Sequence, residues 1–314
     1  MGSAVSALEL WEIAQDQGLR LPTKDYWAFH KLIKMSAPEQ YEEYLKRFDL
    51  TEKIQSSPNA MFEVIQRGIA KAYLKNHITK IELRFNPIYR NQKGSIDLDH
   101  IIVYAIHGME RAMLKFPVQA GLVLCLDRRL SNKENAGIVK KAIKYHKRGV
   151  VGIDLAGSIS ANDHARSFQP AQIKEMVADA KAAGLGITIH TGEVTEVNEM
   201  WEVIHELKPD RLGHGIACVH DPKLMKYLKE QNIVLETCPS SNLQTKVIAN
   251  FDQMRQIYRA LLNHQVKFTI NTDGPEFLDT SLLHEYQLLL ANHILTKEEI
   301  LKANQIASAA SFIN

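Results

Sequence analysis

Residues 171–191 read AQIKEMVADAKAAGLGITIHT and contain the repeating unit from which the fold is predicted. Apolar side chains recur at helical spacing in the first part, at Ile173, Met176, Val177 and Ala180. This spacing predicts a helix over residues 171–183, with Gly184 as its carboxyl-terminal stop. Residues 186–190 form a short apolar, β-branched run, which predicts a strand directly after the helix. Such a succession indicates a parallel sheet covered by helices.

The same unit recurs along most of the chain. Apolar, β-branched runs predict seven strands in all, at residues 80–86, 118–126, 150–155, 186–190, 211–214, 233–237 and 266–272. Helical patterns at residues 222–231 and 251–263 separate the later strands. Residues 1–79 precede the first strand and are expected to be mainly helical. Helix starts are predicted at Ser6 with Glu9, at Ser57 with Pro58, and at Thr296 with Glu299.

Alternating strands and helices predict an α/β barrel of the TIM type, (β/α)₈. No linker rich in Gly, Pro or Ser divides the chain, so a single domain over residues 1–314 is expected. A barrel of this class closes with eight strands, and only seven are predicted here. One strand is therefore missing from the count.

The composition restricts the function. The net charge is +2, from 38 basic and 36 acidic residues without blocks, so neither nucleic acid nor a membrane surface is expected as a partner, and a small neutral substrate fits better. The three cysteines are far apart, which argues against a disulfide scaffold and for a reducing compartment. No membrane-length apolar run and no signal peptide are found, so a cytoplasmic protein is expected.

Polar motifs stand at the carboxyl ends of the predicted strands, where barrel enzymes carry their chemistry. They are His190-Thr191-Gly192-Glu193, Leu212-Gly213-His214-Gly215, Cys238-Pro239-Ser240-Ser241-Asn242, Asn271-Thr272-Asp273-Gly274, and Asp154-Leu155-Ala156-Gly157. Each motif alone has a structural explanation, such as a hydrogen-bonded histidine or an aspartate in a turn. Together, His190, Glu193, His214 and Asp273 would meet in one cleft and offer ligand types suited to a catalytic divalent metal.

In this order the five motifs resemble the motif set of the adenosine and AMP deaminase family. The resemblance extends from Leu8 to Phe312, and residues 9–14 and 18–22 resemble the family's first helix and loop. It implies a zinc-dependent hydrolase that deaminates adenosine or a related aminopurine nucleoside and releases ammonia, a step of purine metabolism. Another metal-dependent amidohydrolase on the same barrel fits less well, because the Leu-Gly-His-Gly and Cys-Pro-Ser-Ser-Asn motifs match deaminases together.

The resemblance also implies residue roles. His190 and Asp273 would bind Zn²⁺, one ion per chain, and Glu193 would carry the proton at the purine ring nitrogen next to the leaving amine. His214 would be the partner of the metal-bound water, and Gly157 would offer its backbone N–H to the base. Zinc lowers the pKa of bound water from about 15.7 to roughly 7, which generates a nucleophile. Glu193 must start protonated, so burial is expected to raise its pKa.

The sequence departs from the family at the metal site. The family's first strand carries a His-x-His pair, and this sequence has no such spacing among its 13 histidines. Gly2-Ser3 resembles the residues just after that pair, although it also fits a cloning remnant. We expect a family member shortened at its amino terminus, without the first strand. In the alternative, another segment or a partner chain fills the gap, or the chain is a silent homologue that binds purine or a partner.

A second departure concerns substrate contact. Family members that act on adenosine commonly carry a second aspartate at the position of Gly274, where it contacts the purine. Glycine cannot make this contact, although Gly before Pro275 also suits a turn. A modified adenosine, another adenine nucleoside or adenine itself therefore stays open as the substrate. Glu285 is a replacement polar group in the helical pattern at residues 281–290, where a solvated face is the expected role, and Cys238 and Ser241 are expected to support the site.

Overall fold

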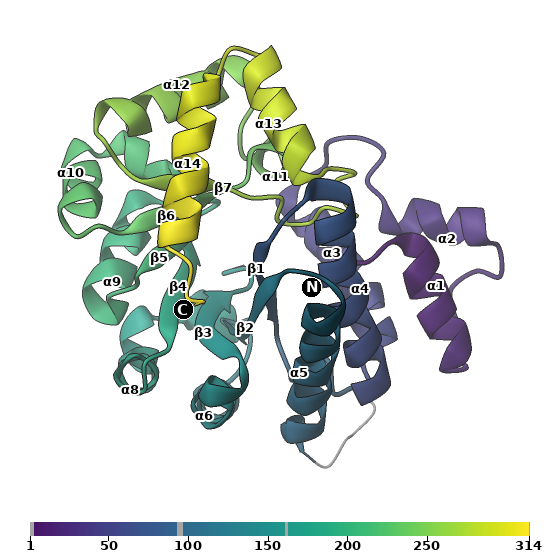
Figure 1. Cartoon of the computed structure of the whole chain (residues 1–314). Helices are drawn as coiled ribbons and strands as arrows, with labels where there is room; N and C mark the ends of the chain where they lie inside the picture. The colour runs from purple at the N-terminus through teal and green to yellow at the C-terminus, as the bar shows by residue number, and fades with distance from the viewer. Residues whose placement is uncertain (1–2, 93–96, 161–162, 314) are drawn as a thin grey trace.

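Seven parallel strands form one sheet in the computed structural model of the chain, which describes residues 3–92, 97–160 and 163–313 (Figure 1). Gly2 lies outside the described residues. The strands are β1 (Lys80–Phe85), β2 (Gln119–Asp127), β3 (Val150–Ala156), β4 (Gly186–Thr191), β5 (Arg211–His214), β6 (Val234–Thr237) and β7 (Phe268–Ile270). Each strand pairs with the next one along the chain, in the order β1 to β7. All seven predicted strands are confirmed.

Helices connect these strands and precede the first of them. They are α1 (Ala7–Asp16), α2 (Tyr26–Ile33), α3 (Tyr41–Ile54), α4 (Pro58–Asn76), α5 (Leu98–Lys115), α6 (Asn132–Tyr145), α7 (Asp163–Ser167), α8 (Lys174–Ala182), α9 (Val197–Leu207), α10 (Pro222–Glu230), α11 (Pro239–Gln244), α12 (Phe251–Asn263), α13 (Leu282–Ala291) and α14 (Lys297–Ala309). Three short 3₁₀ helices are η1 (His146–Arg148), η2 (Pro170–Ile173) and η3 (Ile216–His220). The helical segment before β1 is therefore confirmed.

Local sequence signals explain the helix starts. Ser6 Oγ accepts a hydrogen bond from Glu9 N at 3.3 Å, and Ser6 N donates to Glu9 Oε2 at 2.8 Å, so the predicted capping box is present. Ser57 caps α4, with Pro58 at its first position. The helix expected over residues 171–183 differs at its start, because η2 forms its first turn and α8 begins only at Lys174. A tighter first turn is common at helix amino termini.

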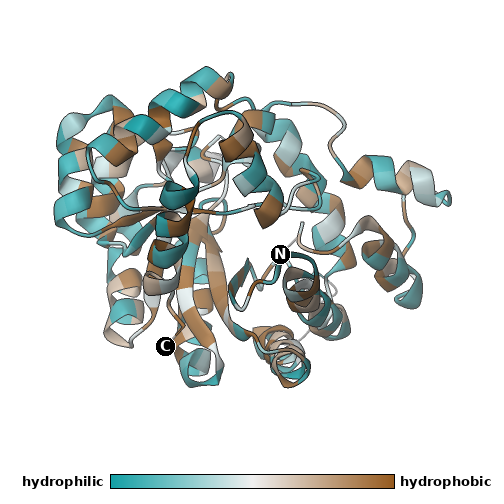
Figure 2. Cartoon of the chain, turned by 45° about the horizontal axis from the view of Figure 1, so that its top comes forward, coloured by the Kyte–Doolittle hydropathy of each residue, from teal (hydrophilic) through white to brown (hydrophobic). Residues whose placement is uncertain are grey.

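The core lies between the sheet and its helices. Ile153, Leu155, Ile187, Leu212 and Leu235 of the central strands are all fully or almost fully buried. Figure 2 shows the strands mainly in the brown of apolar residues, whereas the outer helices carry much of the teal. Nearly continuous apolar strands are the pattern expected where helices cover a parallel sheet.

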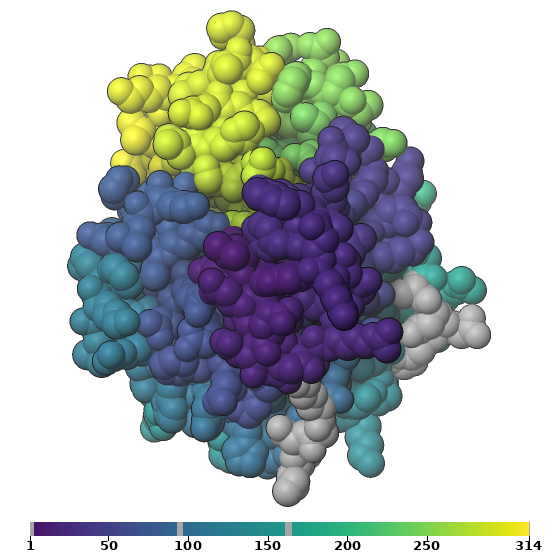
Figure 3. Space-filling view, turned by 90° about the vertical axis from the view of Figure 1, so that its right-hand side faces the viewer, coloured from purple at the N-terminus to yellow at the C-terminus, as the bar shows by residue number. Residues whose placement is uncertain are grey.

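The amino-terminal helices form a second apolar cluster. Leu10 of α1, Phe29 of α2 and Tyr44 of α3 are buried in it together with Phe277 and Leu278, which follow β7 in the chain. Figure 3 shows these purple amino-terminal helices packed beside the yellow carboxyl-terminal part. Tyr44 and Phe277 are in edge contact, with ring centroids 6.1 Å apart. Segments from the two halves of the chain thus meet beside the carboxyl ends of the strands.

The sheet does not close on itself. Within the described residues, β1 pairs only with β2, and β7 pairs only with β6. The fold is therefore a TIM-type half-barrel of seven strands, in agreement with the expectation that the first strand is missing. None of the described helices is both long enough and apolar enough to cross a membrane.

Candidate active site

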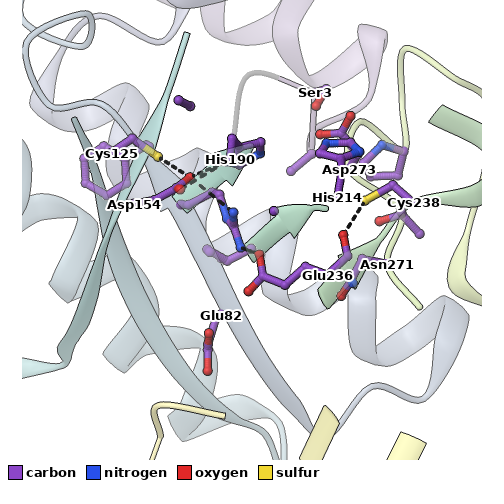
Figure 4. Close-up of a pocket in the computed structure, with 18 of the residues that line it drawn as sticks. Ser3, Glu82, Cys125, Asp154, His190, His214, Glu236, Cys238, Asn271 and Asp273 are labelled. Carbon is purple, nitrogen blue, oxygen red and sulfur yellow. Dashed lines mark hydrogen bonds and ion pairs between the residues drawn. The ribbon is translucent and has the colours of Figure 1, made fainter. Parts of the chain in front are cut away.

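The strand-end residues singled out in the sequence meet in one cavity. His190 lies in β4 and His214 ends β5, while Glu193 and Asp273 lie in the loops after β4 and β7. All four line a cavity of about 1140 Å³, and so does Gly157 after β3. Figure 4 shows His190, His214 and Asp273 on one side of this cavity. The carboxyl ends of parallel strands lie at one edge of the sheet, which is why residues far apart in sequence meet here.

His190 is held from three sides. Its Nδ1 lies 3.0 Å from Asp154 Oδ1, and its backbone oxygen accepts a hydrogen bond from Arg128 Nη2 at 2.7 Å. A Cβ atom at Gly213 would lie only 2.8 Å from the imidazole ring, so the glycine of the Leu-Gly-His-Gly motif makes room for it. Burial opposes the charged imidazole, but the Asp154 carboxylate outweighs it and raises the pKa of His190. Asp154 thus fixes the ring through Nδ1 and leaves Nε2 available.

Asp154 is itself fully buried and paired. Arg84 Nη1 donates to Asp154 Oδ2 at 3.1 Å, and Arg84 Nη2 donates to Glu236 Oε2 at 2.7 Å. Burial alone would raise the pKa of Asp154, yet His190 and Arg84 together hold it well below the ordinary aspartate value. A buried ionised carboxylate is therefore kept behind His190 by a cation from β1.

Glu193 and His214 form a second buried pair. Glu193 Oε1 lies 3.5 Å from His214 Nδ1, and Asn242 Nδ2 lies 3.3 Å from Glu193 Oε1 and 3.1 Å from His214 Nδ1. Burial, followed by the nearby Asp273 carboxylate, raises the pKa of Glu193 above its ordinary value, although His214 works against this shift. The direction is the one that a carboxylic acid needs in order to donate a proton near neutral pH.

Asp273 is oriented by two hydroxyl groups. Ser241 Oγ donates to Asp273 Oδ2 at 2.7 Å, and Tyr44 Oη lies 3.5 Å from the same oxygen. Burial, together with Asp273 and Glu193, raises the pKa of Tyr44 well above its ordinary value, so its hydroxyl stays protonated. Cys238 Sγ points elsewhere and donates to the backbone oxygen of Glu236 at 3.5 Å.

Gly274 lies next to this group but does not line the cavity. Its backbone is outside the left-handed region, so conformation alone does not require glycine. A Cβ atom would instead lie 2.3 Å from Tyr44 Oη and 3.2 Å from Ser3 Oγ. Gly274 does begin a turn, because its backbone oxygen accepts a hydrogen bond from Leu278 N at 3.0 Å. In addition, Tyr44 Oη already fills the space that a side chain at position 274 would need.

Gly157 and Glu285 are two further residues that the sequence had singled out. Gly157 has a φ of +94°, and a Cβ atom there would meet Asp127 Oδ1 at 2.4 Å, so both conformation and space require glycine. Glu285 does not lie on a solvated face, as the sequence had suggested. It is fully buried, and its carboxylate accepts hydrogen bonds from Ser240 N at 3.0 Å and Thr280 Oγ1 at 2.5 Å. Ser240 lies in the first turn of α11, and Thr280 lines the cavity.

Sequence reasoning missed four residues that shape the site: Arg84, Asp154, Asn242 and Tyr44. Arg84 had a detectable signal, because Glu82 and Arg84 alternate with Ile81 and Leu83 in a strand that helices cover. Asn242 and Asp154 lie inside recognised motifs without a role assigned to them. Tyr44 had no signal, since it lies 229 positions from Asp273 in the sequence.

The metal ligands form only part of a site. Among the described residues, no three His, Cys, Asp or Glu side chains are close enough to hold a metal ion. The family resemblance implies only two ligands, His190 and Asp273, whereas a catalytic zinc ion takes three from the protein. The described residues therefore do not make a zinc site by themselves.

A parallel α/β half-barrel with a histidine, glutamate and aspartate cluster at its strand ends defines a barrel hydrolase. The adenosine deaminase family profile matches residues 3–314, so the chain belongs to this family of metal-dependent hydrolases that act on C–N bonds. An adenosine deaminase of Vibrio vulnificus (strain CMCP6) is 30% identical over 291 residues, which are 92% of this chain and 84% of the relative.

Solved structures agree with this assignment. An N6-mAMP deaminase from Arabidopsis superposes with a TM-score of 0.82 at 25% identity, over 100% of this chain and 91% of that one. An adenine deaminase from Arthrobacter aurescens superposes with a TM-score of 0.85 over 100% of this chain and 91% of that one, and at 17% identity it shows the shared fold alone.

Proposed function

We propose that this chain catalyses the hydrolytic deamination of an aminopurine nucleoside, with adenosine or a modified adenosine as the substrate. Water adds to the ring carbon that bears the amine, and ammonia leaves. One observation carries the proposal: Glu193, with its raised pKa, lies beside His214 in the cavity that His190 and Asp273 also line. A protonated carboxyl group next to an imidazole is the arrangement that this reaction needs.

The proposed roles follow from these contacts. Glu193 donates its proton to the ring nitrogen beside the amine, which makes the neighbouring carbon electrophilic. His214 orients the attacking water and offsets the charge that develops on its oxygen. Asn242 contacts both side chains and fixes their relative orientation. Gly157, which has no side chain between its backbone and the cavity, offers its N–H to the base.

Zn²⁺ is the proposed cofactor, with His190 and Asp273 as two of its ligands. A bound zinc ion would lower the pKa of a water molecule and so make it a better nucleophile. Because two ligands fall short of a catalytic zinc site, zinc-dependent chemistry would need further ligands beside His190 and Asp273. A silent homologue that binds purines without turnover is the second candidate, and the incomplete ligand set is the observation that favours it.

Two kinds of observation support the proposed range of substrates. Gly274 lacks the carboxylate that would contact adenosine, and an Arabidopsis relative of 25% identity is described as an N6-mAMP deaminase. Another neighbouring structure, also 25% identical, contains IMP. A purine substituted at the amine is therefore a candidate beside adenosine itself, and adenine is a third.

Ammonia release tests the proposal. Adenosine, N6-methyladenosine, their 5′-monophosphates and adenine are each incubated with the chain and with a version extended upstream, while zinc content is measured in parallel. Turnover of one of these compounds is expected from the extended version once it is loaded with zinc, because His190 and Asp273 alone fall short of a catalytic zinc site. Glu193→Gln should lower kcat by about 10²-fold or more, the contribution typical of a general acid. Glu196→Gln, at an exposed position three residues away, should leave kcat unchanged.

The outcomes separate the two candidates. Tight binding of an aminopurine without ammonia release, by both the chain and its extended version at full zinc loading, would establish the silent homologue. Full zinc loading and turnover by the present chain would show that no further segment is needed. Equal activity of the Glu193→Gln and Glu196→Gln variants would show that Glu193 does not take part in the reaction.

A further inference from the structure

The hydroxyl group of Tyr44 lies where a side chain at position 274 would extend. A Cβ atom at Gly274 would be 2.3 Å from Tyr44 Oη, and Gly274 directly follows Asp273 in the chain. Tyr44 lines the same cavity as Asp273, and its side chain is only 3% exposed. A residue of α3 therefore places a polar group next to Asp273, at a point where the loop after β7 has no side chain.

The position of this hydroxyl is fixed by the packing of the Tyr44 ring. The ring centroids of Phe48 and Phe277 lie 5.5 Å and 6.1 Å from that of Tyr44, and both contacts are edge contacts. Phe48 and Phe277 also contact each other, with centroids 4.9 Å apart. Because the ring is already immobilised before a ligand arrives, a hydrogen bond from Tyr44 costs little conformational entropy.

The proton of the Tyr44 hydroxyl is available to a ligand. A phenol carries its proton at neutral pH and can donate it to an acceptor. Among the described residues, its hydrogen-bond partner is Asp273 Oδ2 at 3.5 Å, which is longer than the usual distance of about 2.7–2.8 Å between two such oxygens. Ser241 Oγ already donates to the same carboxylate oxygen at 2.7 Å. A buried hydroxyl with only a long hydrogen bond gains free energy when a ligand offers a closer acceptor.

The proposed reaction places the purine relative to these side chains. In an aminopurine, two ring nitrogens lie on either side of the carbon that bears the amine, one in the six-membered ring and N7 in the five-membered ring. Glu193 protonates the first of these in the proposed function, and it pairs with His214 at 3.5 Å. Tyr44 lies instead beside Asp273. N7, which is a hydrogen-bond acceptor in adenine, is therefore the ring nitrogen left for the Tyr44 hydroxyl.

Two other hydroxyl groups lie in the same part of the cavity. Ser3 Oγ would be 3.2 Å from a Cβ atom at Gly274, which is farther than Tyr44 Oη, and Figure 4 shows Ser3 on the same side of the cavity as Asp273. Tyr41 lies almost one turn earlier on α3 and also lines the cavity. Tyr44 is the closest of the three to position 274, and the experiment below separates them.

We infer that the Tyr44 hydroxyl is a specificity-determining group that donates a hydrogen bond to N7 of the bound purine. The inference rests on the proposed function, because it uses the position that Glu193 gives to the base. It narrows the substrates to aminopurines with a free acceptor at N7. A site built to hydrogen-bond its substrate rejects an analogue without the acceptor, because a buried polar group is then left unpaired.

Isothermal titration calorimetry with the 314-residue chain tests the inference, because binding can be measured without turnover. The probes are adenosine and 7-deazaadenosine, which have the same amine and sugar and differ only in the replacement of N7 by C–H. Each probe is titrated into the unmodified chain and into the Tyr44→Phe, Tyr41→Phe and Ser3→Ala variants. Tyr145→Phe is the matched control, since Tyr145 is a buried tyrosine at the end of α6 that does not line the cavity. Circular dichroism establishes that every variant is folded.

The unmodified chain should bind 7-deazaadenosine about tenfold more weakly than adenosine, which is the usual effect of leaving one buried hydroxyl unpaired. In Tyr44→Phe, the affinity for adenosine should fall to that for 7-deazaadenosine, and the affinity for 7-deazaadenosine should change by less than about twofold. The Tyr41→Phe, Ser3→Ala and Tyr145→Phe variants should each keep the difference of about tenfold between the two probes.

Equal affinities of the unmodified chain for the two probes would overturn the inference. A difference that persists in Tyr44→Phe would also overturn it, and so would a difference lost only in Tyr41→Phe or only in Ser3→Ala. Absence of adenosine binding by the folded chain would overturn both the inference and the purine part of the proposed function. Failure of the proposed activity alone is distinguishable: a difference that disappears in Tyr44→Phe, without ammonia release from any aminopurine at full zinc loading, would keep the N7 contact and exclude turnover.

Discussion

At the residue scale, the effect of a substitution at Gly274 depends on Tyr44. Tyr44 Oη occupies the space of a side chain at position 274, and its ring is fixed by Phe48 and Phe277 at centroid distances of 5.5 Å and 6.1 Å. Displacing a tyrosine ring that is packed in this way would cost free energy. A side chain at position 274 would therefore clash with Tyr44 in this structure.

Gly274→Ala should accordingly destabilise the protein by about 1–3 kcal/mol, the usual cost of overpacking. In the Tyr44→Phe background, where the clashing oxygen is gone, the same substitution should cost less, so the two changes should be non-additive. Urea unfolding of the four proteins measures this coupling.

Gly137→Ala is the matched control. No atom lies within 4 Å of a Cβ placed at Gly137 in α6, so this change should raise stability by about 0.5–1 kcal/mol. Additive effects of Gly274→Ala and Tyr44→Phe would contradict the steric explanation.

At the scale of strands and helices, the strands bring together a row of side chains with alternating charges. Glu82 pairs with Arg211, Arg211 with Glu236, Glu236 with Arg84, and Arg84 with Asp154. The five residues come from β1, β3, β5 and β6, so this network connects strands that are not neighbours. Each charge is partnered on at least one side, which offsets the cost of its burial.

This network predicts a loss of stability in acid. Burial alone would raise the pKa of Glu236, but Arg84 and Arg211 outweigh it and lower the value to about 2. An unfolded glutamate has a pKa of about 4.3, so the folded state holds fewer protons than the unfolded state in this range. The contribution of Glu236 is therefore fully present above the unfolded value and is lost as the pH falls toward the folded one.

Glu236→Gln should cost about 3 kcal/mol at pH 7, since it leaves a buried cation without its partner. The difference from the unmodified chain should shrink between about pH 4.5 and pH 2.5, as protonation removes the same charge from the parent. Denaturant midpoints across this range provide the measurement. Glu230→Gln, in an exposed pair with Lys226, should change stability by less than about 0.5 kcal/mol, and a constant Glu236→Gln difference would contradict the prediction.

At the scale of the whole molecule, different segments cover the two ends of the half-barrel. The amino-terminal helices lie beside the carboxyl ends of the strands, whereas Phe312 packs under the opposite end. A Cβ atom at Gly186 would lie 2.2 Å from the Phe312 ring, and Arg211 Cζ lies 3.5 Å from its centroid. Glu82 Oε1 accepts hydrogen bonds from Ser311 Oγ at 2.9 Å and Phe312 N at 2.6 Å. The last residues thus join β1, β4 and β5 beneath an open barrel.

Phe312→Ala should destabilise the protein by about 2–4 kcal/mol, because the ring fills space that Gly152 and Gly186 leave free and also contacts the buried guanidinium of Arg211. Phe312→Leu should cost less than Phe312→Ala, since it retains most of the volume. Chemical denaturation measures both, with Leu114→Ala on the exposed side of α5 as the control, expected to stay within about 0.5 kcal/mol. An unchanged midpoint in Phe312→Ala would show that the tail does not contribute to stability.

The sequence by itself determined the strands, most helix starts and the motifs at the strand ends. These depend on contacts between near neighbours, such as Ser6 with Glu9, or on the rule that parallel strands share a carboxyl edge. It also showed that the chain has seven candidate strands and that no two of its histidines have His-x-His spacing.

The tertiary structure alone decided how the site is supported and where the fold is open. Asp154 reaches His190 across 36 positions, and Tyr44 reaches Asp273 across 229, so no local pattern encodes either contact. The charged network likewise joins side chains of β1, β3, β5 and β6, which lie far apart in the sequence. A periodic pattern specifies which face of a strand is buried, whereas only the assembled sheet fixes which side chains and which free edges face one another.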